Sequence, residues 1–124
     1  MKLHRLASTL DLEAKSASAH LDNEVTGGYA SDLLSDVLAH GRQGDLWVTL
    51  QVHGNIVAVA SMKDLAGIVL VNGRQPDDET LERAEAEGVP ILVSRLPAFD
   101  LIGKLNSLGL HGAGAEGPVK PETT

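Results

Sequence analysis

The chain has 124 residues, 43% of them hydrophobic and 22% charged, which is typical of one folded domain with a substantial core. Its formal net charge of −7, with 10 scattered Lys and Arg residues, excludes nucleic acid and anionic membrane as expected partners. The chain has no cysteine, which excludes disulfides and thiol catalysis. No apolar run reaches the length of a membrane span or a secretory signal, so we expect a cytoplasmic protein.

The N-terminal segment predicts a short amphipathic helix followed by an edge strand. Apolar residues recur at helical spacing over Leu3–Leu10, and the spacing is lost after Asp11. Residues 12–17 predict a short edge strand. A winged-helix opening is the alternative, but the acidic charge and the lack of a basic recognition helix disfavour it.

The stretch 25–37 predicts a strand end, a tight turn and a helix start. We expect a strand over 24–28, with Thr26-Gly27-Gly28 at its end. A helix then follows from Ala30, with an apolar stripe that continues through Leu33, Leu34, Val37 and Leu38. Gly41 is expected to end it as a glycine C-cap.

The middle of the chain predicts two strands with an ambiguous segment between them. Residues 45–50 and 67–71 are rich in β-branched and apolar residues. Residues 56–62 fit either a strand or a helix with Asn55 as its N-cap. Because two parallel strands need a crossover between them, the helix is favoured.

The C-terminal part predicts one more strand between two helices. Residues 77–87 form a helix with acidic residues in its first turn, and Gly88 ends it. Residues 91–94 form a strand, and a helix over 97–108 turns Phe99, Ile102 and Leu105 inward, with Leu101 as a further candidate. We expect the domain to span 1–109, and a disordered tail to span 110–124.

Together these elements predict an α/β fold, in which a small parallel or mostly parallel sheet of three to four βα units carries helices on both faces. Ligands of such sheets bind at the carboxyl ends of the strands. The residues that we expect at this edge as candidate ligand-binding residues are Thr26, Gly27, Gly28, Tyr29, Thr49, Gln51, His53, Asn55, Asn72 and Gly73.

Two of these positions allow opposite interpretations. The backbone N–H groups of Thr26-Gly27-Gly28 are suited to an anion, but the glycines can equally serve a tight turn, and Asp32 and Asp36 would repel a phosphate. His53 can bind a ligand or sense pH, or it can simply bond a nearby backbone carbonyl.

No residue pattern indicates catalysis or a metal. The histidines show neither an HExxH pattern nor a close pair. The glycine pattern at 112–117 matches G-x-G-x-x-G formally, but it follows a helix rather than a strand. We therefore expect no catalytic residue, no metal and no cofactor.

Two long motifs resemble those of DRTGG-domain proteins, especially the small stand-alone bacterial members. They are V-T-G-G-Y-A-S-D-L-L-S-D-V at 25–37 and W-V-T-L-Q-V-H-G-N-I-V-A-V-A at 47–60. The likeness continues through 67–73 and 88–92, and so covers roughly residues 1–110. The wider family is related to the N-terminal domain of HPr kinase/phosphorylase. It also occurs in phosphotransacetylases and beside CBS domains in regulated pyrophosphatases.

The resemblance implies a helix over 56–62 and a regulatory, ligand-sensing or assembly role. It does not imply HPr kinase activity, because that activity belongs to a P-loop domain and this chain has no P-loop motif. The family's D-R, T-G-G and Asp-Thr motifs are replaced here by His53-Gly54-Asn55, Val71-Asn72-Gly73 and Pro97-Ala98. The usual ligand residues of the family are therefore not carried over.

Three hypotheses about function follow. The first is a non-catalytic regulatory or assembly module that acts through homodimerisation or a protein partner, with a redox or signalling pathway suggested by the resemblance. The second is a sensor of a small, nucleotide-like ligand that uses residues 26–29 with His53 and Asn55. The third, an enzyme of unknown class, would need His53 beside a carboxylate in a real pocket.

Overall fold

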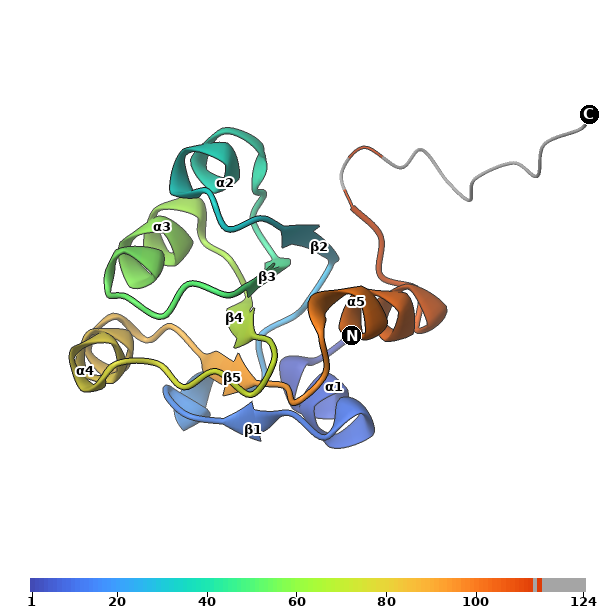
Figure 1. Ribbon diagram of the computed structural model, residues 1–124, viewed down its shortest axis with the longest axis horizontal. Coiled ribbons are helices and arrows are strands. Elements are labelled where there is room, and N and C mark those ends of the chain that lie inside the picture. Colours follow the sequence, from blue (N-terminus) through green and yellow to red (C-terminus); the bar gives the residue numbers. More distant parts are fainter. Residues whose placement is uncertain (113, 115–124) are drawn as a thin grey trace, which may run out of the picture.

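The computed structural model describes residues 1–112 and Gly114. One five-stranded sheet, in the order β1-β5-β4-β3-β2, forms its centre (Figure 1). The strands are β1 (Glu13–Ala14), β2 (Gly27–Ala30), β3 (Asp45–Thr49), β4 (Gly67–Leu70) and β5 (Ile91–Val93). The helices are α1 (Leu3–Leu10), a 3-10 turn at Ser18–His20, α2 (Leu34–His40), α3 (Asn55–Lys63), α4 (Asp78–Glu87) and α5 (Ala98–Ser107).

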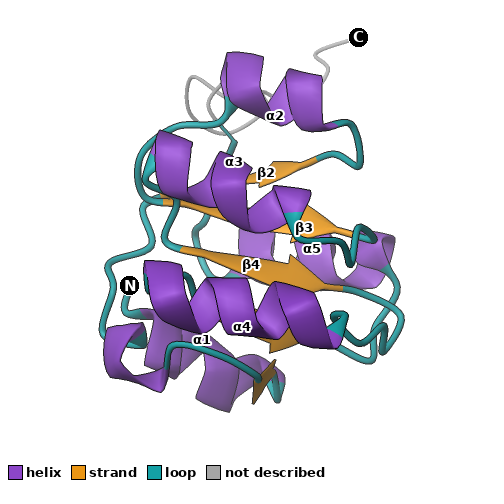
Figure 2. Ribbon diagram, turned by 90° about the vertical axis from the view of Figure 1, so that its left-hand side faces the viewer, coloured by secondary structure: helices purple, strands orange, loops and turns teal. Residues whose placement is uncertain are grey.

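Strands β2 to β5 are parallel, and only β1 runs antiparallel, against β5. Figure 2 shows α2, α3 and α4 side by side in front of the sheet, with α1 and α5 behind it. The predicted class, a mostly parallel sheet with helices on both faces, is therefore confirmed.

Each face of the sheet has its own hydrophobic core, because alternate strand residues project to opposite faces. Trp47 and Ile68 belong to the core under α2, α3 and α4. Leu46 and Val69 belong to the core under α1 and α5. Strands β3 and β4 are buried on both faces, which explains why their sequences are almost continuously apolar.

The predicted crossover helix is also confirmed. Residues 55–63 form α3, which connects β3 to β4. The predicted N-cap is wrong by one position, since Gly54 caps the helix and Asn55 is its first residue. The Gly88 stop is confirmed, with Gly88 in the left-handed conformation (φ 69°).

The predicted strand end and turn at 26–28 are wrong. Gly27 and Gly28 are the first two residues of β2, paired in register with Asp45 and Leu46 of β3. The Thr26 amide donates to the Gly44 carbonyl at 3.0 Å, just before β3. Residues 24 and 25 bond the N-terminal segment instead, because the Val25 amide donates to the Met1 carbonyl and Glu24 bridges to Lys2. The two glycines are therefore extended strand residues at the amino end of the sheet.

Helix α2 is shorter than the helix that the apolar stripe from Ala30 predicted. Residues 31–33 form a loop instead, in which the Ser31 hydroxyl accepts the Leu33 amide and the Ser31 carbonyl accepts the Trp47 indole N–H at 2.8 Å. Val37 is the buried residue of this helix, whereas Leu33 exposes 64% of its surface. The predicted C-cap at Gly41 is confirmed, since its amide donates to the Val37 carbonyl at 2.7 Å, although its backbone is extended and not left-handed.

Helix α5 begins after Pro97, close to where the sequence predicted, and the predicted inward position of Leu105 is confirmed, whereas that of Phe99 is wrong. Leu101 and Leu105 are buried, and Phe99 exposes 88% of its surface. After the helix, Leu110 packs into the core under α1 and α5, one residue beyond the predicted domain boundary. Of the predicted tail, residues 113 and 115–124 lie outside the described residues.

Candidate functional site

The predicted site residues do not form one site. Thr26 and Gly27 lie at the amino end of β2, whereas His53 and Asn72 follow the carboxyl ends of β3 and β4. The opposite ends of parallel strands cannot contribute to one small-molecule site. The predicted grouping of residues 26–28 with 51–55 and 72–74 is therefore wrong.

Gly27 allows a close approach of two other groups. A Cβ atom there would lie 2.8 Å from the Asp45 Oδ1 and 3.0 Å from the His111 carbonyl oxygen. The Asp45 carboxylate is buried and accepts the Arg42 amide at 2.8 Å, so it has little freedom to move. Close packing explains this glycine without an anion.

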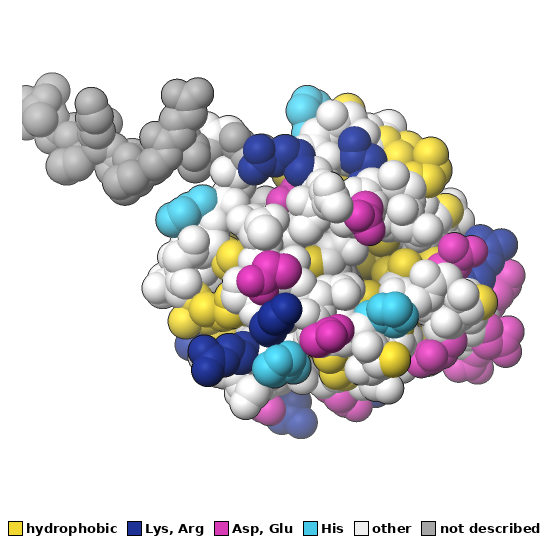
Figure 3. All heavy atoms as spheres, turned by 180° about the vertical axis from the view of Figure 1, so that it is seen from behind, with side chains coloured by type: hydrophobic (Ala, Val, Ile, Leu, Met, Phe, Trp, Pro, Cys, Tyr) yellow, Lys and Arg dark blue, Asp and Glu magenta, His cyan; other side chains and the backbone are white. Residues whose placement is uncertain are grey.

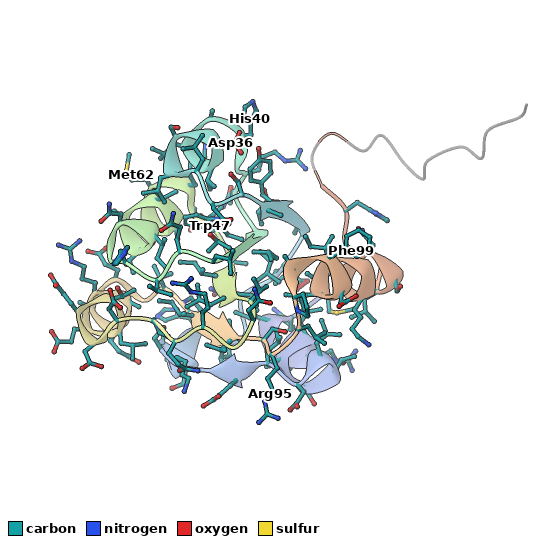
Figure 4. All side chains as sticks on the ribbon, viewed as in Figure 1. Asp36, His40, Trp47, Met62, Arg95 and Phe99 are labelled. Atoms are coloured by element: carbon teal, nitrogen blue, oxygen red, sulfur yellow. The ribbon has the colours of Figure 1, made fainter. Side chains whose placement is uncertain are left out.

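Tyr29 belongs to a small polar cluster beside α2. Its hydroxyl donates to the Asp36 carboxylate at 2.8 Å, and the His40 ring stacks on the Tyr29 ring at 6.3 Å between centroids. The His40 Nδ1 lies 3.1 Å from the other Asp36 oxygen, and Figure 4 shows Asp36 and His40 on α2. The hydrogen bond from Tyr29 is the main cause that lowers the pKa of Asp36.

Thr49 and Gln51 are used to hold two loops together. The Asp32 Oδ1 accepts the Thr49 hydroxyl at 2.8 Å and the Leu50 amide at 2.7 Å. The Gln51 side-chain amide donates to the Asp32 carbonyl at 2.9 Å. These polar groups at the carboxyl edge of β2 and β3 therefore bond one another around Asp32, which the sequence indicated only as a carboxylate that would repel a phosphate.

His53 lies beside a carboxylate. Its Nδ1 is 2.9 Å from the Asp77 Oδ2, across the loops that follow β3 and β4. The two side chains are 70% and 51% exposed. A shallow cavity of about 330 Å³ adjoins them, and its other lining residues are Gly54, Asn55, Glu79, Thr80 and Arg83.

The Arg83 side chain covers the start of α3. A Cβ atom at Gly54 would lie 3.1 Å from the Arg83 Cδ, so the glycine permits this close packing. Arg83 brings a positive charge to His53 and Asn55, but Asp77 and Glu79 line the same cavity. Acidic and basic groups are therefore mixed here, which disfavours simple anion binding.

Asn72 and Gly73 follow β4, and the chain runs from there to α4 on one face of the sheet. The chain after β5 runs to α5 on the other face, so the two connections separate at this point. In α/β sheets this point opens a ligand crevice. Here the Asn72 amide donates to the Leu96 carbonyl at 2.9 Å, and the Gly73 amide donates to the Ser94 carbonyl at 2.8 Å. These backbone bonds join the loops after β4 and β5, and an open cavity of about 440 Å³ lies beside Gly73 and Arg95. Arg95 points away from the sheet (Figure 4).

The sequence did not predict a cavity between β2 and α5. It has a volume of about 260 Å³ and is lined mainly by apolar residues and glycines of β2, β3, α5 and the segment after α5. Gly27 and Gly28 lie at its β2 wall. The pair of adjacent glycines in a strand was the available signal, because strand glycines mark places where another group approaches closely.

Two further structural findings concern the described part of the chain. Within residues 1–112 and Gly114, no three His, Asp or Glu side chains are arranged so that they could hold a metal ion. In the same residues, every helix is too short or too polar to cross a lipid bilayer.

Comparisons with known proteins bear on the fold. No protein-family profile and no curated protein matches this chain. Among solved structures, the chain is similar to the CBS and DRTGG domains of the regulatory region of Clostridium perfringens pyrophosphatase, in complex with its activator diadenosine tetraphosphate. The TM-score is 0.67 at 14% sequence identity, and the match covers 82% of this chain and 44% of that chain.

This similarity shows a shared fold, and the chain spans less than half of the length of that regulatory region. It agrees with the DRTGG resemblance at the level of architecture. It does not bear on the HPr kinase/phosphorylase relation, which stays a prediction.

Proposed function

We propose that the chain is a non-catalytic regulatory or assembly module that acts through homodimerisation or a protein partner. The main support is a group of exposed apolar side chains on and beside the adjacent helices α2 and α3. Leu33, Leu38 and Met62 expose 64%, 37% and 75% of their surfaces. Figure 3 shows hydrophobic side chains gathered over α2. Grouped apolar residues on a folded surface are typical of protein-binding sites.

The polar groups at the carboxyl edge of the sheet bond other groups of the protein, which also supports a non-catalytic role. Asp32, Thr49 and Gln51 bond one another, and the amides of Asn72 and Gly73 are bonded to the loop after β5. Few polar groups are left to act on a substrate. The similar fold of a pyrophosphatase regulatory region is consistent with such a role.

The test of homodimerisation is the mass of the chain in solution. Sedimentation velocity over a concentration series should give twice the chain mass at tens of micromolar, with dissociation on dilution. A monomer across this range would contradict homodimerisation.

A small-ligand sensor is the second candidate, and the His53–Asp77 pair beside its cavity favours it. The structurally similar pyrophosphatase region is in complex with diadenosine tetraphosphate, a nucleotide. Thermal unfolding with AMP, ATP, diadenosine tetraphosphate and acetyl phosphate tests this candidate. A bound ligand at 100 times its Kd should add about 2.7 kcal/mol to the unfolding free energy.

The matched variants for this screen are His53→Gln and His4→Gln, both exposed histidines. The first should abolish the thermal shift, and the second should keep it. The absence of any shift at millimolar ligand would contradict the sensor hypothesis.

The His53–Asp77 pair also meets one condition that we set for an enzyme. A carboxylate at Nδ1 orients an imidazole so that Nε2 can act as a base. However, His53 is 70% exposed, and no side-chain hydroxyl of the described residues is hydrogen-bonded to it. An enzyme therefore stays the third hypothesis.

A further inference from the structure

The cavity between β2 and α5 exists because the two helices on that face do not cover the whole width of the sheet. Helices α1 and α5 cover the face, and α5 packs against β3. The edge strand β2 extends beyond this cover, and the remaining space has a volume of about 260 Å³. The residues that line it are Gly27, Gly28, Tyr29, Ala30, Leu46, Val48, Ile102, Leu105, Asn106, Leu110, His111 and Gly112.

We propose that this cavity is a binding site for a small, uncharged and mainly apolar ring compound. Its described lining includes no Lys, Arg, Asp or Glu side chain, so a charged group placed there would lose water without gaining a partner. A cavity of about 150 Å³ in another protein holds benzene. A volume of about 260 Å³ therefore suits a compound with one or two rings.

Gly28 provides an independent argument. It pairs with Leu46, whose side chain lies in the core under α1 and α5, so a side chain at position 28 would project over the same face. Its backbone does not have the positive φ that favours glycine. A Cβ atom would come no closer than 3.5 Å to its nearest neighbour, the Leu46 carbonyl oxygen.

Neither backbone conformation nor packing therefore requires a glycine at position 28. A glycine within a strand also lowers stability by roughly 0.5–1 kcal/mol relative to alanine. Gly27 differs, because the Asp45 carboxylate and the His111 carbonyl leave no room for its Cβ. The effect of the missing side chain at Gly28 is to keep the cavity open next to the backbone of β2.

The segment after α5 forms the outer wall. Leu110 is 8% exposed, and the His111 carbonyl accepts the Gly28 amide at 3.3 Å. Asn106 and His111 are polar residues of the lining. A mainly apolar pocket with one or two polar groups is the usual form of a small-molecule site.

The experiment follows the backbone amide signals of the full chain, labelled with 15N, during titration with indole as the neutral probe. We expect shift changes at Gly28, Ala30, Ile102, Leu105 and His111. Indole-3-carboxylate is the charged analogue and should bind at least tenfold more weakly. This result does not depend on homodimerisation, because it is measured at constant protein concentration.

Matched leucine substitutions test the place of binding. Gly28→Leu should fill part of the cavity and weaken indole binding at least tenfold. Gly103→Leu is the control, because Gly103 is exposed on α5 with open space at its Cβ position. If Gly28→Leu disturbs the fold, Asn106→Phe narrows the cavity from the exposed side of α5 and should weaken binding in the same way.

Five results would overturn the proposal, four of them from the titrations. These four are no shift changes at millimolar indole, shift changes confined to other surfaces, equal binding of the two probes, and unchanged binding by the folded Gly28→Leu or Asn106→Phe chain. Shift changes at the same amides on raising the protein concentration without a probe would also overturn it, because a second copy would then fill the cavity.

Discussion

At the scale of single residues, the two glycines of β2 have different physical roles. Gly27 is enclosed by a buried carboxylate and a backbone carbonyl, whereas Gly28 faces open space. The sequence showed only two adjacent glycines before a helix, a pattern typical of a turn. The difference depends on Asp45 and His111, which lie 18 and 84 residues away from Gly27, and local sequence cannot show it.

We expect Gly27→Ala to lower the free energy of unfolding by about 1–3 kcal/mol, because its Cβ would overpack against Asp45 and His111. Gly28→Ala is the matched control and should change it by less than about 1 kcal/mol, because a Cβ atom there makes only ordinary contacts. Urea unfolding, followed by the fluorescence of the single tryptophan, Trp47, measures both. Equal losses in the two variants would contradict this account of Gly27.

The Tyr29–Asp36 pair predicts a pH dependence. The lowered pKa of Asp36 means that its contribution to stability is present above the ordinary value of 3.8 and is lost as the pH falls through the lower value in the fold. Tyr29→Phe removes the main cause, so the pKa of Asp36 should rise toward its ordinary value and the part of the stability that depends on this carboxylate should become smaller. The titration of the Asp36 carboxyl signal by NMR measures this change.

His40→Gln is the control for that titration. Because the contact with His40 lowers the pKa of Asp36 less than the hydrogen bond from Tyr29 does, this variant should produce a smaller rise. A larger rise than in Tyr29→Phe would show that the cluster is organised around His40 instead.

At the scale of elements, the sequence predicted the positions of strands and helices best where the sheet is buried on both faces. Strands β3, β4 and β5 and helices α1, α3 and α4 lie within one or two residues of the expected positions. It predicted least well at the sheet edge, where β2 and α2 begin later than expected. There the start of each element is set by bonds to distant residues, such as the one from Trp47 to the Ser31 carbonyl.

A buried serine adds to the backbone pairing that attaches β1 to β5. Ser16 is 3% exposed, and its hydroxyl donates to the Val89 carbonyl and accepts the Ile91 amide, both at 2.9 Å. Ser16→Ala leaves both backbone groups unpaired, so we expect a loss of about 2–3 kcal/mol in the free energy of unfolding. Hydrogen exchange should accelerate at β1 and the β1-facing amides of β5.

Ser18→Ala is the control, because Ser18 is exposed in the turn that follows. It should change the free energy of unfolding by less than about 0.5 kcal/mol. A similarly small change in Ser16→Ala would mean that water replaces the hydroxyl.

At the scale of the whole molecule, the surface divides into two areas of interest. The exposed apolar residues on and beside α2 and α3 lie on one face of the sheet, and the cavity beside α5 lies on the other. A protein partner and a small molecule could therefore be bound at the same time. Phe99, on α5, is exposed away from the α2–α3 group (Figure 4).

The proposed dimer predicts a difference between two exposed apolar residues. Met62→Lys places a charge within the α2–α3 group and should weaken dimerisation at least tenfold in sedimentation velocity. Phe99→Lys is the matched control and should leave the dimer unchanged, because its site lies on the opposite helical layer. Dissociation by Phe99→Lys alone would place the dimer interface on α5 instead.

The sequence by itself determined the fold class, most of the elements and the acidic, cysteine-free character of the chain, because hydrophobic period and composition are local properties. Tertiary structure decided which residues meet. It placed His53 against Asp77, used Thr49 and Gln51 to hold Asp32, and bonded the amides of Asn72 and Gly73 to the loop after β5. It also moved Gly27 and Gly28 from a predicted turn into an edge strand beside a cavity. These outcomes depend on contacts between segments far apart in the chain, which no local pattern encodes.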